Sequence, residues 1–297
     1  NGLEPENISP YHIGFVLGPC LNASGRLDTA KRALKLLLAE TREEAAVLAG
    51  DLKNLNESRK EMTAQGVEKA IESTSMMEDT VLVVFLPECH ESLAGIIAGR
   101  LRERYHKPSF VLTRGEEGVK GSGRSIEAYS MYEKLCECKE YLTKFGGHPM
   151  AAGLSLEEEN VETFRRKLNE RSGLSQEDLV EKVSIDVPMP IHYIRKDLVR
   201  ELSLLEPFGK GNEKPLFAQK NLWISQLRVF GKNRNVVKMR LTDENGYPMD
   251  GVYFGDGDAF AEEARGKQKI AIVYYPDINV YQGRESLQVI IRHYQFD

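Results

Sequence analysis

Glycine-rich segments that also carry phosphate-binding side chains hold the most informative chemistry of the sequence. The segment Phe145-Gly-Gly-His-Pro-Met-Ala-Ala-Gly153 places two glycines directly before His148. Glycines let the backbone approach a ligand closely and free the amides to point at an anion, and a histidine can donate a hydrogen bond to a phosphate oxygen. A tight turn whose histidine is satisfied within the protein is the alternative, and a single Gly-Gly-His by itself favours that alternative.

The segment Lys120-Gly-Ser-Gly-Arg-Ser125 alternates glycine with a hydroxyl group and a guanidinium group. The hydroxyl is a hydrogen-bond donor, and the guanidinium is a bidentate fork that matches the oxygens of a phosphate. The segment lacks the spacing of a P-loop, and no Gly-Lys-Ser/Thr ends it. A glycine-rich hairpin without a ligand explains the pattern equally well.

A third segment, Gly18-Pro-Cys-Leu-Asn-Ala-Ser-Gly-Arg-Leu-Asp28, is predicted to be a loop that runs into a helix. The first turn of that helix would carry Arg26, and a junction of this kind offers free backbone amides to anions. Asp28 can be a simple first-turn partner of the helix dipole, and we assign it no function.

Periodic patterns predict the elements that must position these segments. Apolar residues at helical spacing predict helices at 26–40 and 42–77. The second is long enough to be a connecting strut, which can bend at Asn56-Glu-Ser-Arg59. The apolar, β-branched run 80–86 predicts a buried strand. The following elements are expected to be a helix at 92–105, a strand at 109–113, a glycine-rich stretch at 119–125, a helix at 129–145, a strand at 152–156 and a helix at 161–171. This alternation indicates a small α/β domain.

After about residue 180 the pattern becomes all-β. Strands are predicted at 222–229, 236–241, 251–254, 269–275 and 287–293, with turn signals between them. Five short strands of this spacing suit a small closed barrel, for which the OB-fold is the commonest solution. The fold class predicted is therefore multidomain, α/β plus all-β, with a helical connector.

Aromatic residues of the predicted barrel can stack on nucleic-acid bases. The candidates are Trp223, Phe230, Tyr253, Phe254 and Tyr281. Most aromatic residues of a small barrel belong to its core, so Phe230 and Tyr281, which lie beside turn signals, are the better candidates. The segment Leu205-Glu-Pro-Phe-Gly209 is expected to be a hinge that seats the barrel against the preceding domain.

The net charge of −5 argues weakly against a nucleic-acid partner, but the basic residues are concentrated in two windows. The windows contain Arg100, Arg102, Arg104, Lys107, Arg114, Lys120 and Arg124, and Lys210, Lys214, Lys220, Arg228, Lys232, Arg234, Lys238 and Arg240. A local basic stripe can recruit phosphate although the total charge is negative. An ordinary solvated face is the alternative.

Other functional classes find little support in the sequence. The four cysteines, Cys20, Cys89, Cys136 and Cys138, lack the paired spacing of a zinc site and are expected to be free thiols in a reducing cytoplasm. No apolar run approaches the roughly 18 to 20 residues of a membrane span. Because the sequence opens on Asn1-Gly-Leu3 without an initiator Met, we expect it to be an internal or trimmed piece.

Five motifs in order resemble the bacterial RecJ single-stranded-DNA exonucleases of the DHH superfamily. They are Gly-Pro-x-x-Asn-Ala-x-Gly-Arg-Leu, His-x-x-x-x-Gly-Ile-x-Ala-x-Arg-Leu from His90 to Leu101, Gly-Ser-x-Arg-Ser, Gly-Gly-His-x-x-Ala-Ala-Gly, and Leu-Glu-Pro-Phe-Gly-x-Gly-Asn from Leu205 to Asn212. Each motif alone is weak, whereas the ordered set covers nearly the whole chain. The resemblance implies the end of a DHH domain and a long connecting helix at 1–78, a DHH-associated α/β domain at 79–176, and an OB-fold nucleic-acid-binding domain at 177–297.

The resemblance also implies roles for individual residues. The implied substrate-binding residues are Asn22, Arg26, Ser122, Arg124, Gly146, Gly147 and His148. The arginines and the serine look like a pocket for a 5′ phosphate that Asn22 helps to shape, and the Gly-Gly-His residues look like the part that holds a substrate phosphate near the metals. His90 matches a family histidine, but buried packing or helix capping explains its presence equally well. The departure from the family at Ser92-Leu93-Ala94, where a glycine is usual, affects only local detail.

The function implied is the substrate-binding part of a 5′-to-3′ single-stranded-DNA exonuclease of DNA repair and recombination. Its Mn2+ or Mg2+ ions would be bound by a domain whose Asp-His-His motif is absent from this sequence. We therefore expect no catalytic and no metal-binding residue in this chain and no nuclease activity from it alone. The implied partners are single-stranded DNA, a single-strand-binding protein and a helicase, in the cytoplasm and without a membrane.

Two other functions remain open from the sequence. One is a DHH-family phosphodiesterase of short oligonucleotides or cyclic dinucleotides, against which the barrel speaks. The other is a non-catalytic RecJ-like replication scaffold, which the intact set of phosphate-binding residues disfavours.

Overall fold

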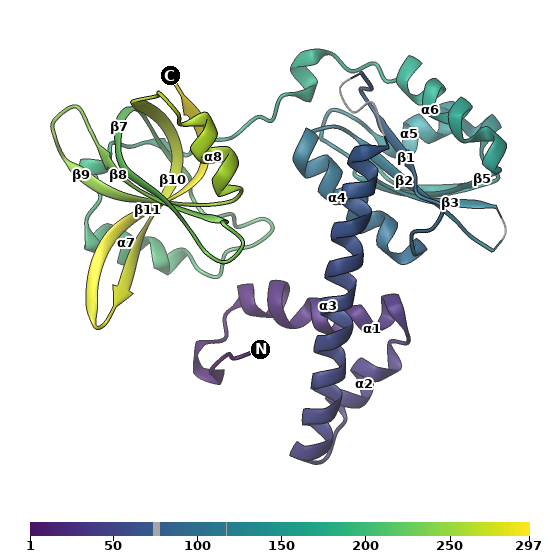
Figure 1. The fold of residues 1–297 in the computed structure, drawn as a ribbon, viewed down its shortest axis with the longest axis horizontal. Helices are drawn as coiled ribbons and strands as arrows, with labels where there is room; N and C mark the ends of the chain where they lie inside the picture. The colour runs from purple at the N-terminus through teal and green to yellow at the C-terminus, as the bar shows by residue number, and fades with distance from the viewer. Residues whose placement is uncertain (74–77, 117) are drawn as a thin grey trace. The chain divides into compact units, whose positions relative to one another are not determined.

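The computed structural model describes residues 1–73, 78–116 and 118–297, and it divides into two compact units, Asn1–Glu181 and Lys182–Asp297 (Figure 1). The first unit contains a helical segment and an α/β domain, and the second contains a β-barrel. The predicted fold class is confirmed.

The helical segment is built around one long helix. Its helices are α1 (Gly18–Leu27), α2 (Lys31–Leu37) and α3 (Arg42–Glu72), preceded by a 3-10 turn (Pro5–Asn7) and a π-helical turn (His12–Leu17). Thr41 caps α3, because its hydroxyl accepts a hydrogen bond from the Glu44 amide at 3.2 Å. Both α1 and α2 pack against α3.

The predictions for these helices need correction. A single helix at 26–40 is wrong, because α1 already begins at Gly18 and the chain breaks between α1 and α2 at Asp28, whose φ is −149° and ψ −109°. Pro19 does not prevent this helix, since a proline is tolerated in a first turn. The predicted bend at residues 56–59 is absent from α3, which runs unbroken to Glu72, and residues 74–77 of the predicted helix lie outside the described part.

The α/β domain contains a five-stranded sheet in the order β1-β2-β3-β5-β4. Its strands are β1 (Leu82–Phe85), β2 (Ser109–Arg114), β3 (Val119–Arg124), β4 (Lys144–His148) and β5 (Ala151–Leu156). Its helices are α4 (Glu91–Tyr105), α5 (Met131–Glu137) and α6 (Val161–Glu170). The β1–β2 pair is parallel, joined by α4, and the other pairs are antiparallel.

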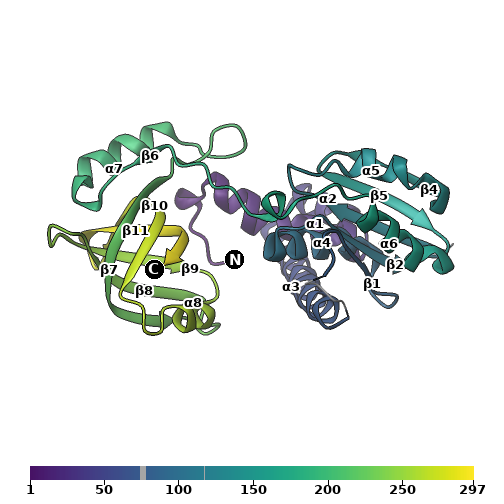
Figure 2. The same ribbon diagram turned by 90° about the horizontal axis from the view of Figure 1, so that it is seen from above.

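The two faces of this sheet are covered differently. On one face α4 packs over β2 and β3, with Leu93, Ile97 and Leu101 against Val84 and Val111. The opposite face carries the larger core and is covered by α5 and α6 (Figure 2). On the α4 side, the outer strands β5 and β4 present only exposed or half-exposed residues. This exposed face of β4 and β5, which we call the shelf, therefore adjoins α4.

The structure resolves one glycine-rich segment of this domain and corrects one predicted helix. The glycine-rich stretch 119–125 contains β3, which forms an antiparallel hairpin with β2 and also pairs with β5. The helix predicted at 129–145 is only α5, followed by a 3-10 turn (Lys139–Tyr141) and by β4. Two consecutive glycines disfavour a helix, and pairing with β5 satisfies the backbone of the Gly-Gly-His segment instead.

The second unit is a six-stranded sheet, order β10-β11-β9-β8-β7-β6, which an additional β10–β7 pairing closes into a barrel. Its strands are β6 (Val187–Pro188), β7 (Phe217–Phe230), β8 (Val236–Thr242), β9 (Pro248–Phe254), β10 (Lys269–Tyr281) and β11 (Arg284–Phe296). Its helices are α7 (Lys196–Leu202) and α8 (Gly257–Glu263), with 3-10 turns at Ile191–Tyr193 and Ser203–Leu205. A further 3-10 turn, Gln176–Leu179, lies near the end of the first unit.

All five predicted strands occur in the barrel, but β10 and β11 extend well beyond the predicted bounds as one long hairpin. Helix α8 was missed because Gly255-Asp-Gly257 is typical of a turn; Asp256 instead caps the helix, accepting from the amides of Asp258 and Ala259 at 3.1 and 3.0 Å. The hinge predicted at 205–209 is wrong, since this segment lies inside the second unit, where Phe208 lines a hollow with Tyr275.

Candidate nucleic-acid interface

Strands β3 and β4 place four of the candidate residues on the face of the sheet that α4 partly covers. Ser122 lies opposite Val111, which packs under α4, and Arg124 follows two residues later on the same face. The two aligned rows across β3, β5 and β4 are Ser122, Gly153, Gly146 and Arg124, Ala151, His148. Two strand spacings, about 10 Å, therefore separate the backbones of Arg124 and His148.

Two positions of the first row, Gly146 and Gly153, have no side chain and expose the main chain of the shelf. A Cβ atom built on Gly146 would have no heavy atom within 4 Å, and one on Gly153 would meet only the Gly121 carbonyl oxygen at 3.8 Å. The packing of the protein therefore does not require glycine at either position. Glycine in open space is typical of a site where a ligand approaches the main chain.

Gly147 has a different reason to be glycine. Its φ is +151°, and a Cβ there would lie 2.5 Å from the Ala151 carbonyl oxygen and 2.6 Å from the Ala152 Cα. Strand pairing on the core side thus excludes any side chain. Of the two glycines in the Gly-Gly-His segment, Gly147 serves the fold and Gly146 faces the shelf.

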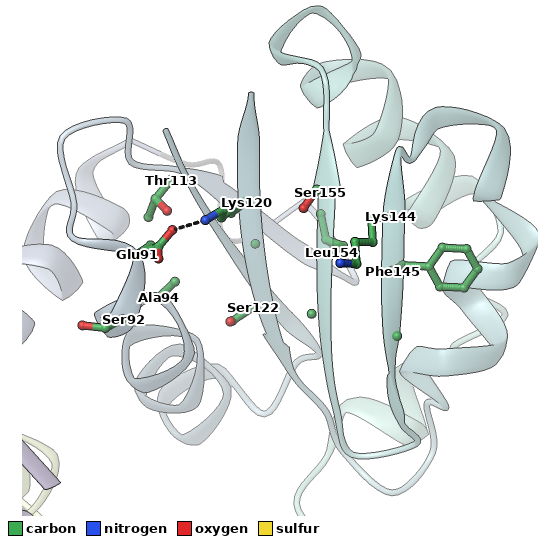
Figure 3. A pocket seen from close by; sticks show the side chains of 13 residues that line it. Glu91, Ser92, Ala94, Thr113, Lys120, Ser122, Lys144, Phe145, Leu154 and Ser155 are labelled. Carbon is green, nitrogen blue, oxygen red and sulfur yellow. Dashed lines mark hydrogen bonds and ion pairs between the residues drawn. The ribbon is translucent and has the colours of Figure 1, made fainter. Parts of the chain in front are cut away.

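A cavity of about 520 Å³ lies between the start of α4 and the strands β3, β5 and β4 (Figure 3). Its polar lining consists of Glu91, Ser92, Thr113, Lys120, Ser122, Lys144 and Ser155. Lys120 on β3 forms an ion pair of 2.8 Å with Glu91, the first residue of α4. The cavity therefore offers hydroxyl groups and glycine backbone, with lysines at its rim.

Arg124 is held at the junction of β3 and α4. Its Nη1 donates to the Gly123 carbonyl oxygen at 2.7 Å, and its guanidinium lies against the helix at Gly95. Burial lowers the pKa of Arg124, and the nearby charge of Arg26 lowers it further. No carboxylate forms an ion pair with Arg124 in the described part of the chain.

Arg26 reaches the same junction from the helical segment. Its Nη1 donates to the Ser92 carbonyl oxygen in the first turn of α4 at 3.0 Å. The prediction that Arg26 lies in a first helical turn with free amides is wrong, because Arg26 lies in the last turn of α1. Asn22, exposed one turn earlier on α1, shares its helix face. Arg26 and Arg124 thus meet beside α4 from two distant parts of the sequence.

Sequence reasoning missed a third arginine in this cluster. Arg59 on α3 is half-buried, and its Nε donates to Oδ1 of the buried Asn56 at 3.1 Å. Burial lowers the pKa of Arg59, as do the charges of Arg26 and Arg100. No sequence signal distinguishes Arg59 from a solvated helix residue, because its neighbours depend on how α1 packs on α3.

The two histidines of the motifs occupy different environments. His148 is exposed at the end of β4. His90 is the N-cap of α4, where its Nδ1 accepts from the Ser92 amide at 3.3 Å and lies 2.8 Å from the Ser92 hydroxyl. Of the two interpretations left open for His90, the structure favours capping.

The barrel carries a second, smaller groove. Its cavity of about 260 Å³ is lined by Gln226, Arg228, Phe230, Lys238, Arg240, Asp250, Asn279, Ser286 and Gln288. Lys238 lies 5.8 Å from the centroid of the Phe230 ring, and Phe230 and Phe254 are aligned across Val236 on the same outer face. Basic groups and aromatic rings therefore share this surface.

The other aromatic candidates divide between surface and core. Trp223 and Tyr281 are 45% and 68% exposed, and Lys269 Nζ lies 4.7 Å from the Trp223 ring. Tyr253 instead packs against Phe260 and Tyr294, with ring centroids 5.1 and 5.2 Å away. Tyr253 is thus partly buried against the barrel core and is a weaker candidate for stacking on a base.

Comparisons with known proteins identify both domains. Residues 78–173 match the DHHA1 domain and residues 185–293 match the RecJ OB domain. The chain carries the DHHA1 and OB domains of the RecJ family. It is 35% identical to the single-stranded-DNA-specific exonuclease RecJ of Bacillus subtilis over 94% of this chain and 36% of that protein. It is 34% identical to the Escherichia coli exonuclease of the same name, over 97% of this chain and 52% of that protein.

A crystal structure of RecJ in complex with Mg2+ from Thermus thermophilus superposes with a TM-score of 0.83 at 27% identity, over 97% of this chain and 44% of that one. A second crystal structure holds RecJ in complex with Mn2+. The RecJ-family chain thus spans between about a third and a half of the relatives it matches.

The two RecJ crystal structures hold Mg2+ or Mn2+. Within residues 1–73, 78–116 and 118–297, no three or more His, Cys, Asp or Glu side chains gather to hold a metal ion. The residues present therefore do not fit a two-metal or zinc site. The four cysteines are free thiols. Across the same residues, every helix is too short or too polar to cross a bilayer.

Proposed function

We propose that this chain is the substrate-binding part of a 5′-to-3′ exonuclease that degrades single-stranded DNA in repair and recombination. Its relatives from Bacillus subtilis and Escherichia coli are single-stranded-DNA-specific exonucleases, which supports the substrate and the reaction class. The observation that carries the proposal is the convergence of Arg26, Arg124 and Ser122 beside α4, next to a shelf of bare glycine backbone.

The proposed role of the arginines is to bind a terminal 5′ phosphate. Arg124 is partly withdrawn from water and has no carboxylate partner in the described residues, so its remaining donors suit a phosphate dianion. Arg26 supplies a second charge from α1, and the Ser122 hydroxyl adds a neutral donor from the next row of the sheet. A terminal phosphate dianion should bind this cluster more strongly than an internal phosphodiester, which carries a single negative charge.

The following nucleotides are proposed to cross the shelf. Gly146 and Gly153 leave room for a sugar-phosphate backbone to approach the sheet, and His148 at the end of β4 lies where a further phosphate can accept a hydrogen bond. Asn22 is proposed to border the same path from α1.

The barrel is proposed to bind a longer stretch of the DNA strand without recognising its base sequence. Arg228 and Lys238 can neutralise phosphates, while Phe230 and Phe254 can stack on bases of any identity. For the full-length protein only, we propose single-strand-binding protein and a helicase as further partners.

The metal chemistry is proposed to lie outside this chain. The described residues do not fit a metal site, so Mg2+ or Mn2+ would be held by a DHH domain of the full-length protein. We accordingly expect the 297-residue chain to bind DNA and to leave it uncut when manganese is added. Metal-dependent shortening of a labelled oligonucleotide by the purified chain would contradict this expectation.

The test compares a 5′-phosphorylated single-stranded oligonucleotide with its 5′-hydroxyl counterpart by fluorescence anisotropy. Arg124→Ala should lower the affinity for the phosphorylated end about 10- to 100-fold and leave the hydroxyl end unchanged, because charged hydrogen bonds of this kind contribute about 1.5–3 kcal/mol. Arg166→Ala, which removes an exposed arginine of α6, is the matched control.

The alternatives give other outcomes in the same assay. Unchanged binding by Arg124→Ala would support a non-catalytic scaffold. Binding that is limited to dinucleotides, and indifferent to Lys238→Ala in the groove, would support a phosphodiesterase of short oligonucleotides. Loss of the end preference in Arg124→Ala, with weaker binding of long strands in Lys238→Ala, is the pattern expected of the exonuclease.

A further inference from the structure

Helix α4 carries two glycines one turn apart, Gly95 and Gly99, and both face the side chain of Arg124. A Cβ built on Gly95 would lie 2.8 Å from Arg124 Nη2, 3.3 Å from Cζ and 3.4 Å from Nη1. A Cβ on Gly99 would lie 3.9 Å from Arg124 Cγ, which is an ordinary contact. The guanidinium therefore lies directly on the helix at Gly95, and the aliphatic part of the side chain passes Gly99.

The three atoms nearest to this missing Cβ all belong to the Arg124 guanidinium. This distinguishes Gly95 from a packing glycine such as Gly66 on α3, whose Cβ would lie 2.5 Å from Ile97 Cδ1 in the core. A glycine in the interior of a helix weakens that helix relative to alanine. The packing of α4 on the sheet gives no reason for this weakness, whereas the placement of Arg124 does.

We infer that Gly95 is a positioning residue that fixes the guanidinium of Arg124 and so sets the preference for a 5′-phosphorylated end. The absence of a side chain at Gly95 leaves a space that the Arg124 guanidinium fills, and we call this space the seat. The hydrogen bond from Nη1 to the Gly123 carbonyl oxygen holds the guanidinium there from the strand side. A seated guanidinium presents its remaining donors in one direction. The effect of Gly95 on DNA binding rests on the proposed function, whereas the seat itself is a property of the fold.

The inference predicts opposite effects on stability and on binding. Gly95→Ala should raise Tm by about 2 °C, since alanine favours the helix and the displaced atoms are the end of a flexible side chain. The same change should lower the affinity for a 5′-phosphorylated oligonucleotide about three- to tenfold and leave the affinity for a 5′-hydroxyl oligonucleotide unchanged. Gly99→Ala is the matched control, with a similar rise in Tm and no change in end preference.

A double-mutant cycle in the 297-residue chain separates positioning from a general structural role. If Gly95 acts through Arg124, then Gly95→Ala has no further effect on end preference once Arg124→Ala is present. An equal loss in both backgrounds would overturn the inference, as would an unchanged end preference in Gly95→Ala.

A second measurement tests the seat without DNA. The rate at which phenylglyoxal modifies Arg124, followed by peptide mass spectrometry, should rise severalfold in Gly95→Ala and stay at the wild-type value in Gly99→Ala. An equal rate in all three proteins would overturn the inference even if the DNA assay succeeds. If the wild-type chain binds both oligonucleotide ends equally, the proposed function fails, and the labelling rates alone decide the seat.

Discussion

The proposed anion site beside α4 and the proposed groove of the barrel are built by opposite means. The first gathers few groups and partly withdraws one of them, Arg124, from water, because this side chain lies against a helix and burial lowers its pKa. The second spreads exposed cations and rings over several strands, and some of its charge is already neutralised, as Arg240 pairs with Asp250. A desolvated, fixed site suits recognition of one end, whereas an exposed groove suits any stretch of strand.

The largest expected effect tests whether the glycines of the first region serve the fold or the ligand. Gly147→Ala should lower the free energy of unfolding by about 3 kcal/mol, because it combines a positive φ with a clash against backbone. Gly146→Ala should leave stability unchanged and weaken binding of single-stranded DNA by about 1 kcal/mol. Thermal unfolding and anisotropy on both variants give the comparison. Equal destabilisation by the two changes would show that the open shelf has no separate role.

The next effect tests the barrel. Phe230→Ala should weaken binding of a long single strand by about 2 kcal/mol, since stacking on one base contributes about 1–3 kcal/mol. The loss should be the same for 5′-phosphate and 5′-hydroxyl ends, in contrast to Arg124→Ala. Tyr193→Ala removes another exposed ring, one that lies outside the groove, and should change neither affinity. A loss restricted to phosphorylated ends would contradict the division of labour between the two regions.

The sequence predicted most of what depends on local pattern. Alternation and turn signals located all five predicted barrel strands, and residue type marked Ser122 and Arg124 as phosphate-binding candidates. Their common face, however, depends on register: one residue of slip between β3 and β2 would turn both side chains into the core.

What the sequence could not predict depends on contacts between distant segments. The helix α1 looked like a loop because Gly18-Pro19 is typical of one, although proline also suits a first helical turn. Arg59 joins the arginine cluster only because α1 packs on α3. The different reasons for Gly146 and Gly147 appear only once β4 is paired with β5.

A smaller effect concerns acid and the stability of the barrel. Asp243, 1% exposed in its side chain, lies 2.8 Å from His192 Nδ1. Burial by itself would raise the pKa of Asp243, but hydrogen bonds from the Tyr247 amide, His192 and the Asn245 amide outweigh burial and lower it. Its stabilising contribution is therefore present above the unfolded pKa of about 3.9 and is lost as pH falls through the lower folded pKa.

Asp243→Asn keeps the shape of this side chain and removes its charge. At pH 7 the variant should lose about 1 kcal/mol of barrel stability, and the difference from wild type should shrink once the pH falls below the folded pKa. Fluorescence of Trp223, the single tryptophan, reports on the barrel without contribution from the other unit. A difference that persists unchanged into strong acid would show that the charge is not the stabilising feature.

The smallest expected effect separates the two regions by salt. For single strands, each protein cation that neutralises a phosphate contributes about 0.7 to the slope of log affinity against log salt. Arg124→Ala and Lys238→Ala should each reduce the slope by about that amount with a 5′-phosphorylated strand. With a 5′-hydroxyl strand only Lys238→Ala should do so, because the terminal phosphate that Arg124 would neutralise is missing. If Arg124→Ala reduced both slopes equally, Arg124 would contact internal phosphates. The site beside α4 would then bind any part of the strand, as the groove is proposed to do, and would not be specific for the 5′ end.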